Sequence, residues 1–299
     1  MKSRNRSILL NNANPEQYIY RIEDIDRLID SIANNQTSFT NPDYWRSRDD
    51  KWEKIFGDTL LVGDQSFQYH IKCRVQCWST LKESDALWRI YSKCTDELKK
   101  DYKGVKVKVK IKNYLDAIDE LDHESNFFTQ EGLNDVMLAG PVKYLDISEI
   151  TEILNNPWFV AKLASRNKFS QEYEKTLFIK RDSFAHENEF RILWTKKATG
   201  STFEEENFSY LKIGYKRLIE EIILDPRISE KTEDEYRQIF QKNGISNSII
   251  KKSTLDDPPK ITPYTTKYLE KIAALDNINL LRESDNHLRE IIRKHHNLQ

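Results

Sequence analysis

Hydrophobic and polar residues alternate most clearly from Val105 to Lys112, where valines and one isoleucine take turns with four lysines. Successive side chains of a strand point to opposite faces, so this pattern predicts a strand with one apolar and one basic face. Less clear patterns predict further strands. They lie at residues 18–22, 67–79, 141–145, 219–224 and 249–255.

Other stretches repeat hydrophobic residues at helical spacing, as Ile25, Leu28, Ile29 and Ile32 do. The predicted helices span residues 24–34, 84–99, 114–121, 147–154, 159–174, 231–242, 264–281 and 283–296. Strands and helices are mixed without strict alternation, which predicts an α+β fold with a largely antiparallel sheet and surrounding helices. The run Asp256-Asp257-Pro258-Pro259 favours a boundary. We therefore expect one domain at residues 1–257 and a C-terminal helical extension at residues 258–299.

Composition narrows the class of protein. Charged residues make up 32% and hydrophobic residues 38% of the 299 residues, so a core can form under a polar surface. The net charge of −1 provides no global field that would attract nucleic acid. Cys73, Cys77 and Cys94 form no even disulfide framework, and no apolar run approaches the length of a membrane span. The N-terminus also lacks the apolar core of a signal peptide. We expect a soluble, cytoplasmic protein.

The chemistry most worth testing lies between Thr176 and Trp194, where Glu187 and Glu189 are separated by one residue. In an extended strand the two carboxylates would share a face. Glu-x-Glu by itself is most often a solvated strand edge, because glutamate is rarely buried without a partner. Two upstream stretches change that balance, Tyr20-Arg21 on the first predicted strand and Cys77-Trp78-Ser79-Thr80 on a later one.

Together these residue types suit cleavage of a nucleotide N-glycosidic bond. Arginine provides a fork of donors for a pyrophosphate, and a serine hydroxyl can fix a ribose. Aromatic planes can hold the leaving base, and a carboxylate can stabilise the developing oxocarbenium ion. A second carboxylate can deprotonate an acceptor.

The order Arg … Ser-Thr … Glu-x-Glu, with each part on its own strand, resembles the Arg–Ser–Glu class of ADP-ribosyltransferases. Most of residues 18–255 is also similar to a bacterial family without assigned chemistry. Its members share an aromatic-Arg start, a Cys-aromatic-Ser strand followed by a Trp–Tyr helix, and a Lys … Glu-x-Glu-x-Arg strand. The strings that carry this similarity are YRI, FTNP, CWS, ALWRIY, PVKY, LFIKRDSFAHENEFRI and IEEIILDP.

The first resemblance implies a split-sheet ADP-ribosyltransferase-like core that uses NAD as its substrate and needs no metal. Arg21 would anchor the dinucleotide and Ser79 would orient the ribose. Glu189 would stabilise the oxocarbenium ion and Glu187 would activate the acceptor. The other cofactor-binding candidates are aromatic, and the last three of them would wall the nicotinamide or adenine: Tyr20, Trp78, Trp88 and Tyr91.

The chain departs from the transferase pattern in two places. Ser79 is followed by Thr-Leu rather than Thr-Ser, and only Phe184 can be the aromatic residue expected shortly before the glutamates. The biological setting that the resemblance implies is a bacterial toxin held by an antitoxin or chaperone, or a component of phage defence. The acceptor would be a protein side chain or a nucleic acid.

A nucleic acid would meet the basic face of the 105–112 strand, which carries Lys106, Lys108, Lys110 and Lys112. The other interpretation of these lysines is a solvated outer strand whose edge they protect.

Two other functions stay open at the level of sequence. One is a nuclease or nucleic-acid-binding module in which Glu187, Glu189 and Asp182 hold Mg²⁺. The other is a non-enzymatic interaction protein that uses its C-terminal helices. Structural roles are also possible for the candidate residues themselves. Arg21 would then be an ion-pair partner, Ser79 a strand-end cap, and Trp88 with Tyr91 a core stripe on a helix.

Overall fold

The computed structural model describes residues 7–42, 60–62, 65–67, 73–96, 98, 101–124, 136–159, 175–195 and 207–257. The chain divides into two units, Met1–Asp256 and Asp257–Gln299. The predicted helices at residues 264–281 and 283–296 lie outside the described residues, as does nearly all of the one predicted at 159–174. The domain boundary after Asp257 stays a prediction.

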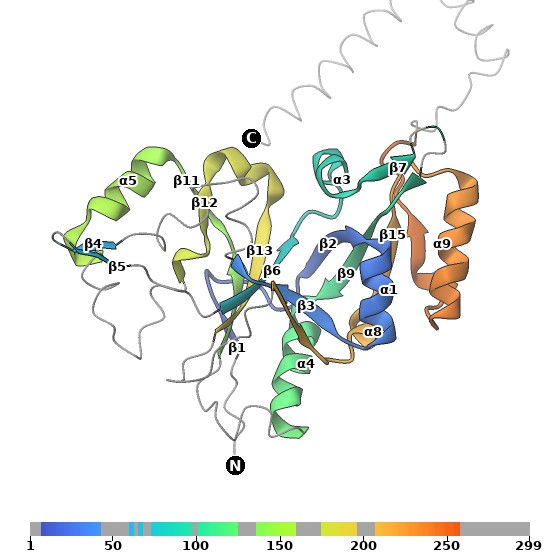
Figure 1. Ribbon diagram of the computed structural model, residues 1–299, viewed down its shortest axis with the longest axis horizontal. Coiled ribbons are helices and arrows are strands. Elements are labelled where there is room, and N and C mark those ends of the chain that lie inside the picture. Colours follow the sequence, from blue (N-terminus) through green and yellow to red (C-terminus); the bar gives the residue numbers. More distant parts are fainter. Residues whose placement is uncertain are drawn as a thin grey trace, which may run out of the picture. The chain divides into compact units, whose positions relative to one another are not determined.

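Within the described residues, ten strands form one large sheet (Figure 1). Eight of them follow one another in the order β1 (Ser7–Leu9), β10 (Val136–Pro141), β13 (Glu189–Thr195), β6 (Cys73–Ser79), β2 (Tyr18–Asp24), β9 (Gly104–Lys110), β15 (Glu221–Leu224) and β16 (Ile250–Lys252). The other two are β3 (Thr37–Thr40), which pairs with β6, and β14 (Phe208–Leu211), which pairs with β3. Apart from the terminal pairs β1–β10 and β15–β16, the described pairings in this sheet are antiparallel. The expected largely antiparallel sheet is confirmed.

Three small two-stranded sheets accompany the large one. They are β4 (Leu60–Val62) with β5 (Gln65–Phe67), β7 (Cys94–Asp96) with β8 (Asp101–Tyr102), and the parallel pair β11 (Lys143–Leu145) with β12 (Ile179–Arg181). In Figure 1, β11 and β12 lie with α5 on the side of β13, and α9 lies on the side of β15.

The helices surround this sheet. Their bounds are α1 (Ile25–Ala33), α3 (Asp85–Tyr91), α4 (Ile111–Glu124), α5 (Ile147–Asn155), α8 (Tyr215–Leu218) and α9 (Glu230–Lys242), with 3₁₀ helices η2 (Asp182–Glu187) and η3 (Asn247–Ile249). None of the helices in the described part of the chain is long and apolar enough to cross a membrane.

Among the described helices, α3 and α4 have bounds that differ from the sequence prediction by more than one residue. α3 starts after Ser84, whose side chain accepts a hydrogen bond from the Leu87 amide. It ends at Tyr91 rather than near residue 99, because Ser92 is extended and leads into β7. The strand predicted at residues 105–112 ends at Lys110, and Ile111 begins α4. Lys112 is therefore helical.

The alternation in β9 decides which face of the sheet is buried under helices. Val105, Val107 and Val109 are fully buried in the main core. The core face of the sheet packs against apolar side chains of four helices, including Leu28 of α1, Tyr114 of α4, Tyr215 of α8 and Phe240 of α9. We call the other side, which carries the lysines of β9, the second face.

The two halves of the sheet meet at one described residue pair. Tyr20 of β2 is the partner of Ser79 of β6, and Ser79 is also the partner of Glu189 of β13. Farther along β6, its partner on the β2 side is Thr40 of β3 instead. Because paired residues point to the same side of a sheet, Tyr20, Ser79 and Glu189 form a row on the second face.

On the core face, Gln76 lies in the part of β6 where its partner changes from β2 to β3. Its amide nitrogen donates to Thr37 Oγ1 at 2.7 Å and to the Ser38 carbonyl at 3.0 Å. Its amide oxygen accepts from Trp78 Nε1 at 2.9 Å and from the Tyr114 hydroxyl at 2.7 Å. All hydrogen-bonding positions of this buried amide are occupied, so Gln76 ties the junction of the sheet halves to α4.

We expect Gln76→Leu to lower the free energy of unfolding by about 2–4 kcal/mol, because several buried polar groups lose their partner. Tyr114→Phe removes fewer bonds and should cost about 1 kcal/mol. Urea unfolding followed by circular dichroism measures both. A Gln76→Leu protein as stable as the wild type would show that the network contributes nothing to the junction.

Candidate active site

The two glutamates are brought together by a turn, not by an extended strand. Glu187 is the last residue of η2, and Asn188 is left-handed, with φ 42° and ψ 54°. Glu189 then begins β13. Asparagine tolerates this conformation better than most residues, which allows the sharp change of direction. The prediction that both glutamates belong to one extended strand was wrong.

The backbone of this turn is fastened to β6 and β11. The Ser79 hydroxyl donates to the Glu187 carbonyl at 2.6 Å and accepts from the Leu81 amide at 3.1 Å. The Glu189 amide donates to the Tyr144 hydroxyl of β11 at 2.8 Å. Ser79 and Tyr144 therefore fix the chain on either side of Asn188.

Both carboxylates are nearly buried and are held by two cations. Lys180 Nζ of β12 lies 2.7 Å from Glu187 Oε2 and 3.5 Å from Glu189 Oε2. Arg191 binds Glu189 through Nε at 2.7 Å and Nη2 at 2.9 Å. Glu187 is 8% and Glu189 6% exposed. We call Lys180, Glu187, Glu189 and Arg191 the glutamate cluster, and its four charges sum to zero.

The cluster sets the ionisation of Glu189. Burial by itself would raise the pKa of this carboxyl group, but the charge and hydrogen bonds of Arg191 act against it. Lys180 and a hydrogen bond from the Cys77 thiol act in the same direction as Arg191, and the pKa of Glu189 falls to about 2. Glu189 is therefore an anion at every physiological pH. Cys77 is half-buried and its thiol contacts this carboxylate.

Two tyrosines stand beside the carboxylates and keep their protons. Burial and the negative charges of Glu189 and Glu187 raise the pKa of Tyr144 to about 12, despite the hydrogen bond from the Glu189 amide. Burial, Glu187 and Glu189 also raise the pKa of Tyr91, although 49% of that residue is exposed. Tyr91 is thus partly open to solvent, and the charges of the glutamate cluster affect its pKa.

The structure brings four of the predicted site residues close to Glu189. Ser79 of β6 and Tyr20 of β2 are aligned with it. Glu187 shares Lys180 with it, and the pKa of Tyr91 is raised by burial and by the negative charges of both glutamates. The roles assigned to these residues stay predictions. The contacts of Ser79 show, in addition, that its hydroxyl already holds the turn of the glutamates.

Arg21 is not part of this group. It neighbours Tyr20 on β2 and pairs with Val107, so it points to the core face. Burial would lower the pKa of Arg21, but the carboxylate of Glu23 and the hydroxyls of Tyr215 and Tyr114 outweigh it and raise the pKa. The prediction placed Arg21 and Glu189 around one dinucleotide. Strand alternation places them on opposite faces of the sheet, because the row of Glu189 passes through residue 20 instead of residue 21.

Trp78 and Trp88 do not offer a ring to a bound base. Trp78 is 3% exposed and packs edge-on against Tyr114 in the main core. Trp88 is fully buried, with Lys106 Nζ 4.8 Å from the centre of its ring. Both rings stabilise the fold, so of the three aromatic residues expected to form the wall only Tyr91 is exposed.

The basic strand does not present a free cationic surface. Each of the four lysines predicted on it, of which Lys112 proves to be helical, pairs with a carboxylate. The pairs are Lys106 with Glu83 at 2.9 Å, Lys108 with Glu221 at 3.5 Å, Lys110 with Glu16 at 2.5 Å and Lys112 with Asp116 at 2.5 Å. Lys106 is also buried, at 3% exposure. These carboxylates compete with any anionic partner for the lysines, and the interpretation of the lysines as a nucleic-acid surface stays a prediction.

Ion pairing also counts against a magnesium site at the glutamates. Glu187 and Glu189 are held by Lys180 and Arg191, and Asp182 is exposed at the start of η2. A divalent cation would have to compete with two resident cations for these oxygens. In the residues that the structure describes, no group of three or more His, Cys, Asp or Glu is placed to hold a metal ion.

Sequence reasoning gave no role to Lys180, Arg191 or Tyr144. Lys180 and Arg191 belong to the Lys … Glu-x-Glu-x-Arg pattern, and strand alternation alone places Arg191 on the same face as Glu189. No local signal identifies Tyr144, because β11 meets Glu189 only through the tertiary fold.

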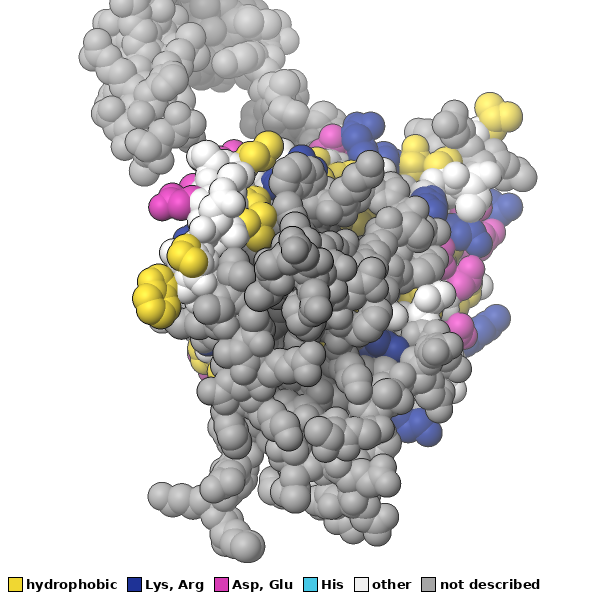
Figure 2. All heavy atoms as spheres, turned by 60° about the vertical axis from the view of Figure 1, so that its left-hand side comes forward, with side chains coloured by type: hydrophobic (Ala, Val, Ile, Leu, Met, Phe, Trp, Pro, Cys, Tyr) yellow, Lys and Arg dark blue, Asp and Glu magenta, His cyan; other side chains and the backbone are white. Residues whose placement is uncertain are grey.

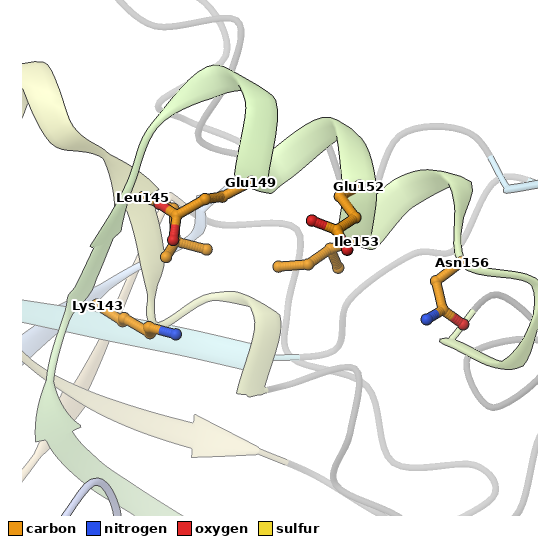
Figure 3. Close-up of a pocket in the computed structure, with 6 residues that line it drawn as sticks. All are labelled: Lys143, Leu145, Glu149, Glu152, Ile153 and Asn156. Atoms are coloured by element: carbon orange, nitrogen blue, oxygen red, sulfur yellow. The ribbon is translucent and has the colours of Figure 1, made fainter.

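A hollow of about 250 Å³ lies behind β11, between that strand and α5. Figure 3 shows Lys143 and Leu145 from β11, with Glu149, Glu152 and Ile153 from α5. Tyr144, the residue between Lys143 and Leu145, reaches Glu189 instead. The hollow and the glutamate cluster therefore use opposite faces of the same short strand.

The side of the molecule that carries α5 also exposes hydrophobic side chains, as Figure 2 shows. Ile147 at the start of α5 is 53% exposed and Trp158 just beyond its end is 81% exposed. Single exposed hydrophobic residues are common on protein surfaces and do not by themselves define an interface.

Comparison with known proteins does not identify the chain. No protein-family model matches it, and no curated protein matches its sequence. Among solved structures, DarT from Thermus sp. 2.9 in complex with carba-NAD+ is similar over 80% of this chain and 96% of that chain. The identity is 11% and the TM-score 0.32. A likeness at this level decides neither fold nor activity.

We expect Arg21→Met to lower the free energy of unfolding by about 3 kcal/mol, because it leaves the buried carboxylate of Glu23 without its neighbouring positive charge. Lys110→Met is the control, since the Lys110–Glu16 pair is partly exposed to solvent and should contribute little to stability. Urea unfolding measures both variants. Unchanged stability together with a raised KM for NAD would return Arg21 to the role of dinucleotide anchor.

Acid should weaken the protein through Glu189. The folded-state pKa of this group, about 2, lies below the unfolded value of 4.5, so its contribution is present above pH 4.5 and is lost as pH falls toward 2. The shift corresponds to on the order of 3 kcal/mol. Urea unfolding between pH 2 and pH 6 should show this loss in the wild type and a smaller one in Glu189→Gln. Equal pH dependence in both proteins would contradict the assignment.

Proposed function

We propose that the protein is an ADP-ribosyltransferase that cleaves NAD at the second face of the sheet. The observation that carries the proposal is the position of Glu189. It is an ionised, nearly buried carboxylate in register with Ser79 and Tyr20, at the junction of the two sheet halves. The Ser79-Thr80 and Glu187-x-Glu189 motifs of the sequence support the same chemistry, whereas Arg21 lies on the core face and gives it no support.

In this reaction the bond between the ribose C1′ and the nicotinamide nitrogen breaks, and its electron pair leaves with nicotinamide. Positive charge then develops on the ribose. A fixed carboxylate beside that charge lowers the barrier, because it is already oriented and needs no proton exchange. Glu189 fits this role, since Arg191 holds it ionised and in one orientation.

The acceptor then forms a bond to C1′ and must lose a proton. Glu187 lies on the other side of Lys180 and is the carboxylate suited to take that proton. Tyr91 is half exposed, and burial and the charges of both glutamates raise its pKa. It remains the candidate for the aromatic wall that holds nicotinamide. No acceptor surface is assigned to the lysines of β9.

The wider architecture fits this assignment. β2 and β6 pair through Tyr20 and Ser79, so the described sheet has two halves that meet beside Glu189. We interpret this as the split sheet of an ADP-ribosyltransferase core. A cytoplasmic toxin held by an antitoxin or chaperone, acting in phage defence and modifying a protein or nucleic acid, is the setting that the sequence resemblance favours.

The test uses NAD labelled in its ADP-ribose part, with nucleic acid or cell lysate as acceptor. We expect Glu189→Gln to slow nicotinamide release by on the order of 10²–10³-fold, the usual cost of removing one electrostatic stabiliser. Glu187→Gln should retain nicotinamide release and lose label transfer.

Glu221→Gln is the matched control, since Glu221 is an ion-paired glutamate of β15 on the same sheet face, paired with Lys108 and Lys251. Thermal unfolding must first show that each variant is folded. An unchanged rate of nicotinamide release in a folded Glu189→Gln protein would contradict the proposed mechanism.

A further inference from the structure

The two cations of the glutamate cluster hold their carboxylates in different ways. Arg191 binds Glu189 with two nitrogens, and its Nη1 donates to the Leu177 carbonyl at 2.5 Å. Its planar guanidinium group is thus fixed at three points and cannot follow a change of charge elsewhere. The pair of Arg191 and Glu189 is a rigid unit.

Lys180 instead stands between the two glutamates. Its ammonium group is closer to Glu187, at 2.7 Å, than to Glu189, at 3.5 Å. The pairing of β12 with β11 sets its backbone, with Lys180 beside Tyr144, and Phe184 covers its side chain with the ring centre 4.6 Å from Nζ. A lysine carries a compact charge on a flexible stem, so small rotations exchange one carboxylate for the other.

The charges in the site change during the proposed reaction. Before transfer both glutamates are anions, and Glu189 faces the positive ribose. After transfer Glu187 has gained the proton of the acceptor, and the positive charge on the ribose is gone. Glu189 is then the carboxylate that most needs a second cation.

From this geometry we propose that Lys180 is a positioning residue that exchanges partners during the reaction. It pairs with Glu187 before transfer, keeps that carboxylate ready to accept a proton, and moves to Glu189 once Glu187 is protonated. Lys180 stays protonated throughout, and nothing is oxidised or reduced. The inference rests on the proposed function, because it assigns the proton of the acceptor to Glu187.

Other charged or titratable groups also lie around Lys180 and Glu187, and they limit how far the pH dependence of transfer can change. They are Glu189 and Arg191 of β13, Cys77 of β6, Tyr144 of β11 and Tyr91 of α3. Arg181 of β12, which lies over the ring of Phe184, and Asp182 and His186 of η2 are the charged or titratable neighbours in sequence. Arg191 is committed to Glu189 and to the Leu177 carbonyl, and the two tyrosines keep their protons. Loss of the positive charge of Lys180 should therefore change the ionisation of Glu187 more than that of the other groups.

Lys180→Met tests this, with Lys180→Arg as the variant that keeps the charge and Lys110→Met as a control outside the site. At pH 7 we expect Lys180→Met to lower label transfer at least about tenfold while nicotinamide release falls only about two- to threefold. The acid limb of the transfer rate should move up by about one pH unit or more, because the anion of Glu187 loses its neighbouring charge. Lys180→Arg should recover most of the transfer.

A second measurement does not depend on catalysis. In protein labelled with ¹³C at glutamate carboxyl carbons, the signal missing from Glu187→Gln identifies Glu187. That signal should titrate at a higher pH in Lys180→Met than in the wild type. An unmoved titration, or an equal fall in nicotinamide release and transfer, would overturn the inference. A wild type that releases no nicotinamide would overturn the proposed function instead, and the titration would still decide whether Lys180 controls the charge of Glu187.

Discussion

Burial of two glutamates side by side requires that each negative charge be neutralised, because desolvation of an unpaired carboxylate costs several kcal/mol. The fold meets this requirement with Lys180 from β12 and Arg191 from β13. The turn at Asn188, the hydroxyl of Ser79 and the hydroxyl of Tyr144 then fix where the carboxylates stand. The small β11–β12 sheet thus has a clear purpose. It delivers a lysine and a tyrosine to the end of a strand in the large sheet.

The second constraint is the register of three neighbouring strands. Tyr20, Ser79 and Glu189 are aligned across β2, β6 and β13, at the position where the two sheet halves meet. A shift of one residue would turn Glu189 into the core and bring Phe190 to the second face. Phe190, Trp78 and Ile19 anchor the register, because all three are buried in the main core. Packing on one face of the sheet therefore determines the chemistry available on the other.

Charge pairing also decides which basic groups can meet a ligand. Each of the four lysines of β9 and the start of α4 is matched by an acid, which for Lys112 comes from the same helix and for the other three from another element or segment. These lysines alternate regularly in the sequence, but the paired carboxylates reduce the positive electrostatic potential around them. Arg21 is likewise tied to the core face by Glu23 and two tyrosines. The cations that remain at the proposed site, Lys180 and Arg191, are bound to the glutamates themselves.

The sequence by itself determined the local structure and the identity of the central motif. Alternation and helical spacing located β2, α1, β9, α5 and α9 and indicated a largely antiparallel sheet, because these patterns reflect burial within one element. The Glu-x-Glu pair was also visible. Only the tertiary structure decided which residues join it. Tyr144 reaches Glu189 from a strand 45 residues away. Residue 20, not residue 21, enters its row because pairing register fixes the face of every side chain. Partners from distant strands are set by pairing and packing, and no local pattern records them.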